Sequence, residues 1–161
     1  MVDVQTVSIA IASASIVVAV IYYILQIRNQ SKMRNIDLVL RLDLVFEGNE
    51  FKEALYTALE RDVKEYDTYS GISSKWRAES KVCGFFETVG FLLRRKLVDL
   101  DFACTAFPTI IVWEKLRFFI EKVSEYRHRH AFQNFEYLYN ETKKYEQKKE
   151  QQLQLKGAQN G

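Results

Sequence analysis

Glu87 is an acidic residue in an otherwise uncharged and largely apolar stretch of the sequence. Residues 83–93 contain no other charged residue. An unpaired carboxylate is costly to bury, so Glu87 is expected to have a partner or to be neutral. On a helix, Arg94 lies on the same face two turns later, and Arg117 belongs to another predicted helix. We predict a structural ion pair of Glu87 with Arg94 or Arg117 that fixes the helix register, and general acid–base catalysis is the alternative.

The two histidines and two cysteines lack the spacing of a metal or redox site. His128 and His130 are two residues apart, so a helix would separate them by about 200°. Cys83 and Cys104 lack C-x-x-C spacing, and in a cytoplasmic domain they are expected to be reduced and mostly buried thiols. The sequence contains no Gly-rich phosphate loop, G-x-S-x-G or H-E-x-x-H motif. We therefore expect no metal, no cofactor and no catalytic residue.

The elements that position these residues are predicted to be helices. The chain has one Pro and six Gly among 161 residues, and 48% of its residues are hydrophobic, which disfavours a loop-rich or all-β fold. Apolar residues recur at helical spacing nearly throughout. The expected helices cover residues 28–46, 50–66 and 75–97, a short segment before Pro108, a helix from Pro108, and a last helix from about Ala131. The Trp, Tyr and Phe residues are expected to fill the core.

The N-terminal segment is the most apolar part of the chain. Residues 4–27 contain no charged residue, and a helix of that length reaches roughly 36 Å, enough to cross a hydrocarbon core of about 30 Å. A cleaved signal peptide, the main alternative, needs a basic start and a shorter apolar run. A buried helix of a soluble protein is the other alternative. We predict a transmembrane helix.

The flanking residues predict the orientation of this helix. Asp3 precedes the span, whereas basic residues follow it. The positive-inside rule then places the N-terminus outside and the C-terminal bulk in the cytoplasm, as in a single-pass protein of the cell membrane. The predicted membrane-interface residues are Tyr22, Tyr23, Arg28, Lys32 and Arg34.

Small residues recur within the span at the spacing that lets helices approach closely. They are Ser8, Ala10, Ala12, Ala14, Ser15 and Ala19. Such a face supports a dimer, although Ala and Ser are also common in weakly hydrophobic spans.

The predicted organisation is all-α: a membrane anchor at residues 1–30, one cytoplasmic bundle of about five helices at residues 31–140, and a polar tail at residues 141–161. The tail is rich in Lys, Glu and Gln and is expected to be frayed or disordered. Lys and Arg total 23 against 21 for Asp and Glu, which is too balanced to indicate a nucleic-acid partner. The expected partners are the lipid bilayer and either a second copy or a cytoplasmic protein.

Two short motifs resemble a known family. FFETVG at residues 85–90, followed by WEKLR at residues 113–117, is similar to an uncharacterised family of small membrane-anchored helical proteins from bacteria and archaea. The resemblance covers roughly residues 35–126. It implies an anchor plus a helical domain without a known activity, and it makes Glu87, Trp113 and Arg117 the structural signature of the family in this chain.

The leading functional hypothesis is a membrane-tethered helical interaction or scaffold module that is not an enzyme. One alternative is an enzyme at the membrane surface that uses Glu87 with Arg94 or Arg117, or the pair of Glu114 and Arg117. Another is a small membrane-active protein, such as a toxin or exclusion factor of a mobile element.

Overall fold

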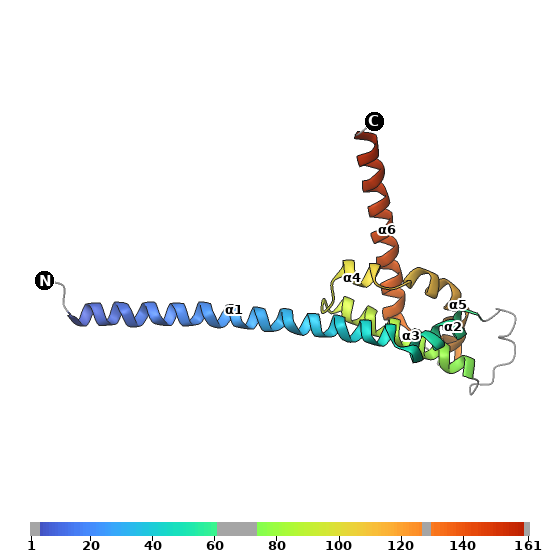
Figure 1. The fold of residues 1–161 in the computed structure, drawn as a ribbon, viewed down its shortest axis with the longest axis horizontal. Coiled ribbons are helices and arrows are strands. Elements are labelled where there is room, and N and C mark those ends of the chain that lie inside the picture. Colours follow the sequence, from blue (N-terminus) through green and yellow to red (C-terminus); the bar gives the residue numbers. More distant parts are fainter. Residues whose placement is uncertain (1–3, 61–73, 127–129, 160–161) are drawn as a thin grey trace. The chain divides into compact units, whose positions relative to one another are not determined.

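The computed structural model describes residues 4–60, 74–126 and 130–159 of the chain. Side chains within these ranges are described except at residues 4–12, 31–32, 74–75 and 156–159. The described residues form helices and no strand (Figure 1). The helices are α1 (Val4–Glu47), α2 (Asn49–Leu59), α3 (Ser74–Arg94), α4 (Leu100–Thr105), α5 (Thr109–Tyr126) and α6 (Gln133–Gln159). The all-α prediction is confirmed.

The chain divides into two compact units, Met1–Leu40 and Arg41–Gly161. The division falls inside α1, which is one continuous helix of 44 residues. The predicted anchor and the first predicted cytoplasmic helix are therefore parts of one element. Among the residues whose side chains are described, no helix combines the length and the apolar composition needed to cross a membrane.

The second unit is organised around α3, which makes its most extensive contacts with α6 and α2. Its core is rich in aromatic rings, as predicted. The buried phenylalanines are Phe51, Phe85, Phe86, Phe107, Phe119 and Phe135. Phe86 stacks on Phe135 with ring centroids 4.8 Å apart, so the centre of α3 meets the first turn of α6 through these two rings.

Local signals account for several helix ends. Gly48, in an extended conformation, precedes α2. The side chain of Asp99 accepts a hydrogen bond from the amide of Asp101 at 2.8 Å and caps α4. Helix α3 ends at Arg94, earlier than predicted, because Lys96 adopts φ 57° and the amides of Lys96 and Leu97 turn back onto Leu93 and Leu92.

The C-terminal tail differs from the prediction. Helix α6 continues to Gln159, so most of residues 141–161 are helical, where a frayed or disordered segment was expected. Charged pairs one turn apart favour this continuation, as in the 2.8 Å ion pair of Lys144 with Glu141. Residues 61–73, which include the end of the helix predicted at residues 50–66, lie outside the described residues.

Candidate functional site

Glu87 lies where α3 meets the start of α6. One carboxylate oxygen, Oε2, accepts hydrogen bonds from the amides of Asn134 and Phe135, both at 2.9 Å. The other oxygen, Oε1, accepts a hydrogen bond from Asn134 Nδ2 at 2.7 Å. Glu87 is partly buried, and the two amides belong to the first turn of α6. A side chain from one helix therefore caps the N-terminus of another.

Helix α6 needs this cap because its own sequence supplies none. Phe132 precedes the helix with φ 59°, a conformation that is strained for a bulky residue, and its side chain has no hydrogen-bonding group. The amides of a first helical turn have no partner inside the helix. The Glu87 carboxylate satisfies two of them, and its negative charge lies at the positive end of the helix dipole.

Gly90 lets the two helices approach closely at this junction. A Cβ atom added to Gly90 would lie 1.9 Å from the carbonyl oxygen of Asn134. The same addition at Gly84 would meet nothing within 4 Å. Of the two glycines that flank Glu87, only Gly90 is required by the packing.

The predicted ion pairs of Glu87 with Arg94 and Arg117 are corrected by this geometry. Arg94 donates from Nη1 to Oδ1 of Asn134 at 3.3 Å, so the Asn134 amide bridges Arg94 and Glu87. Arg117 instead pairs with Glu121, one turn along its own helix, at 3.0 Å. Sequence spacing identified the residues but not their partners, because Asn134 comes 47 positions after Glu87.

A buried acidic residue missed by sequence reasoning precedes this junction on α3. Glu79 is fully buried and has an interaction within the chain. Cys83, one turn later, is also fully buried. Burial raises the pKa of the Cys83 thiol well above its usual value, and the carboxylates of Glu79 and Glu87 raise it further. Such a thiol is an inert core group. The four-residue spacing in the sequence places Glu79 on the same helix face as Cys83, a residue type that is often buried. This spacing could have indicated that Glu79 is buried too.

Glu114 and Arg117, the alternative catalytic pair, each interact with a different residue. Glu114 accepts a hydrogen bond from the Tyr139 hydroxyl at 3.3 Å and pairs with Lys143 at 3.8 Å. Both partners lie on α6. Glu114 therefore links α5 to α6, whereas Arg117 pairs within α5.

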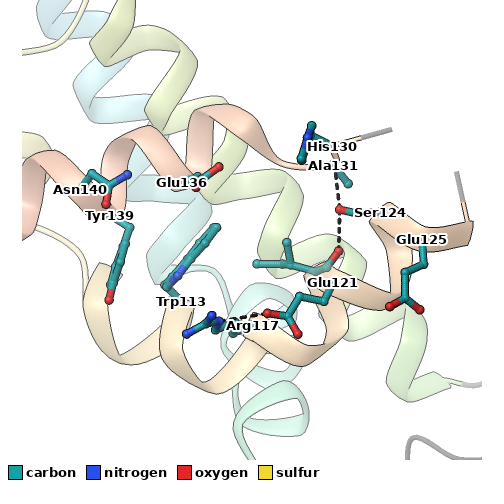
Figure 2. Close-up of a pocket in the computed structure, with 11 residues that line it drawn as sticks. Trp113, Arg117, Glu121, Ser124, Glu125, His130, Ala131, Glu136, Tyr139 and Asn140 are labelled. Atoms are coloured by element: carbon teal, nitrogen blue, oxygen red, sulfur yellow. Dashed lines mark hydrogen bonds and ion pairs between the residues drawn. The ribbon is translucent and has the colours of Figure 1, made fainter. Parts of the chain in front are cut away.

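A groove of about 490 Å³ lies between α5, the start of α6 and the segment before it. Figure 2 shows Trp113 and Tyr139 side by side at this groove, with the pair of Arg117 and Glu121 on α5. The two rings stack with centroids 5.2 Å apart. Trp113 also meets Phe135 edge-on at 4.9 Å. The aromatic wall is therefore held by the same turn of α6 that Glu87 caps.

The polar lining of the groove is more acidic than basic. It includes Glu121, Glu125 and Glu136, against Arg117 and His130. Arg117 is bound to Glu121, and Glu125 pairs with Lys122 at 3.1 Å. Aromatic faces beside carboxylates can bind a cationic or amide group. Sequence reasoning did not find this groove, because its two walls come from different helices.

The structure describes His130 and most of the predicted membrane-interface residues. His130 lines the groove, while His128 lies outside the described residues. Tyr22, Tyr23, Arg28 and Arg34 are exposed on α1, and the side chain of Lys32 lies outside the described residues. Within the described part of the chain, no group of three His, Cys, Asp or Glu residues could hold a metal ion.

Comparison with known proteins identifies the family. Residues 9–142 match DUF4760, a domain of unknown function. No curated protein and no solved structure matches the chain. The matched residues include the Glu87 junction with α6 and the groove beside it. Since the match covers most of its length, the chain belongs to the DUF4760 family.

Proposed function

We propose that the protein is a membrane-tethered helical interaction module. The N-terminal part of α1 holds the protein in a bilayer, and the unit Arg41–Gly161 binds a cytoplasmic partner. The observation that carries this proposal is a band of large apolar side chains that are exposed on all sides of α1. It consists of Ile16, Val17, Val18, Val20, Ile21, Tyr22, Tyr23, Ile24, Leu25 and Ile27.

This apolar band is typical of a helix that is surrounded by lipid. Its side chains are between 48% and 68% exposed. Consecutive residues of a helix point about 100° apart, so Ile16, Val17 and Val18 alone face three different directions. A protein groove covers one face of a helix, whereas lipid covers every face.

The length and flanks of the apolar sequence agree with a tether. The uncharged sequence begins at Val4, ahead of Ser13, the first described side chain of α1. Basic residues follow the band at Arg28 and Arg34, which favours a cytoplasmic C-terminal unit. Tyr22 and Tyr23 lie toward that end, where aromatic rings favour the interface.

The groove between α5 and α6 is the part of the helical unit that best suits a partner. Its stacked Trp113 and Tyr139 provide a rigid aromatic wall, and Glu136 adds a carboxylate. The partner would be a protein segment with Lys or Arg side chains, which bind to both aromatic faces and carboxylates. A catalytic role for Glu87 is less favoured, because both carboxylate oxygens accept hydrogen bonds from α6.

Membrane fractionation tests the tether. The full-length protein should float with vesicles in a density gradient and resist extraction at alkaline pH. Val18→Lys with Ile21→Lys should release it, because each Lys at the centre of a span costs about 2.5–3.5 kcal/mol. Leu44→Lys, at an exposed apolar residue outside the band, is the matched control and should stay bound. Recovery of the wild-type protein in the soluble fraction would refute the tether.

Protease treatment of intact expressing cells tests the orientation. The C-terminal unit should be protected until the membrane is opened. Cleavage of this unit from outside would reverse the proposed topology while leaving the tether intact.

Site-specific photocrosslinking tests the groove. A photoreactive residue at Asn140, which lines the groove, should give a defined adduct in native membranes, and Trp113→Ala should remove that adduct. The same probe at Gln151, exposed on α6, is the control. The partner-binding role is contradicted if both positions give the same adducts or if Asn140 gives none.

A further inference from the structure

We propose that α1 pairs in parallel with α1 of a second copy of this chain, along a seam at residues 15–40. The seam is a row of exposed residues spaced alternately by four and three positions. They are Ser15, Ala19, Tyr22, Gln26, Asn29, Met33, Ile36 and Leu40. Residues at this spacing occupy the a and d positions of a heptad, and on a straight helix they lie within an arc of about 100°.

The part of the seam beyond the apolar band carries exposed apolar side chains. Met33, Ile36 and Leu40 are 66%, 52% and 56% exposed. Arg28 and Arg34 lie among the charged residues of this segment, so lipid does not cover it under the proposed topology. A row of three exposed apolar side chains on one helix face favours a protein partner.

The character of the seam changes along its length, and this change favours a copy of the same helix. Ser15 and Ala19 are small, Gln26 and Asn29 carry amides, and the row then becomes apolar at Met33. A parallel copy presents the same residue type at the same level throughout. Small residues let helices approach closely within lipid, and amides at seam positions pair with their equivalents and fix the register.

The charges beside the seam are complementary in the same arrangement. With Met33 at position a of the heptad, Lys32 occupies a g position and Asp37 the following e position. These positions face each other between parallel helices. The sequence has opposite charges at these two positions, which favours a parallel pairing in this register.

Disulfide crosslinking of the full-length protein in membranes tests the seam. Met33→Cys should form a disulfide-linked dimer under mild oxidation. Asn35→Cys, exposed on the opposite side of α1, is the matched control and should stay monomeric. The wild-type protein is the blank, because Cys83 and Cys104 are buried. Equal crosslinking at residues 33 and 35, or none at residue 33, would overturn the proposal.

A second pair of variants tests the seam without crosslinking. Met33→Glu with Leu40→Glu should convert the dimer to a monomer in detergent, as measured by light scattering, while Asn35→Glu should not. A monomeric wild-type protein in this assay would also overturn the seam. Failure of the tether can be distinguished from failure of the seam. A protein without a tether would be recovered in the soluble fraction, and its disulfide crosslinking at residues 33 and 35 could still be compared there.

Discussion

Gly90 and Asn134 are separated by less space than a methyl group requires. A Cβ atom on Gly90 would lie 1.9 Å from the carbonyl oxygen of Asn134 and 2.5 Å from its carbonyl carbon. Glu87, three residues before Gly90, accepts hydrogen bonds from the backbone and side chain of the same asparagine. The close approach and the helix cap are therefore two parts of one junction between α3 and α6.

Gly90→Ala should destabilise the protein by about 2–4 kcal/mol, because the added methyl group meets backbone atoms that cannot move without displacing α6. The measurement is the free energy of unfolding from urea titration. Gly84→Ala is the matched control on the same helix. It should be neutral or stabilise by up to about 1 kcal/mol, since the site is open and Ala favours a helix. Equal effects at the two sites would contradict the proposed close contact.

Glu87→Ala should cost about 1–3 kcal/mol, because two amides in the first turn of α6 lose their acceptor. Glu87→Gln should cost less, since its amide oxygen can still accept a hydrogen bond but the favourable charge is lost. Hydrogen exchange of the Asn134 and Phe135 amides should speed up in both variants. Glu121→Gln, which removes an exposed ion pair with Arg117, should change stability by less than about 1 kcal/mol. Unchanged exchange at Asn134 in Glu87→Ala would argue against the cap.

Thr109→Val should be neutral or stabilise by about 1 kcal/mol. The buried Thr109 hydroxyl has no hydrogen-bond partner among the described residues, so its removal relieves an unsatisfied polar group. Thr142→Val is the control. The buried hydroxyl of Thr142 donates to the carbonyl of Leu138 at 2.8 Å, and its loss should cost about 0.5–1.5 kcal/mol. Stability is measured by thermal unfolding. If Thr109→Val lost more stability than Thr142→Val, the Thr109 hydroxyl would not be the unsatisfied group.

The two thiols should make the folded state less stable at alkaline pH. Burial raises the pKa of both Cys83 and Cys104, although the neighbouring Thr142 side chain opposes the shift at Cys104. In the unfolded chain a thiol ionises near pH 8.5. The two protonated thiols therefore make their full contribution to the stability of the folded state below that pH. This contribution is lost as the pH rises through the folded-state pKa values.

The measurement is the free energy of unfolding at about pH 7 and pH 9.5, on either side of the unfolded thiol pKa. The wild-type protein should lose stability between the two, and Cys83→Ala should lose less, because it has one ionising thiol fewer. An equal loss in both proteins would show that Cys83 does not titrate in the way its burial implies.

The sequence determined the helical class and most of the helices. Apolar residues three and four apart define a helix face from local spacing alone, so α2, α3 and α5 were expected near their observed positions. Uncharged residues 4–27 were likewise visible without a structure. Local spacing could not show that α6 would continue to Gln159, since a polar helix end lacks an apolar face.

Only the tertiary structure decided what Glu87 contacts. Its partner could not be chosen from spacing, because the amides of Asn134 become available only when α6 begins beside α3. The groove at Trp113 and Tyr139 has the same origin, since its walls lie on two helices that meet through packing. Helix periodicity is a property of neighbouring residues, whereas a hydrogen bond across 47 positions depends on how the whole core is filled.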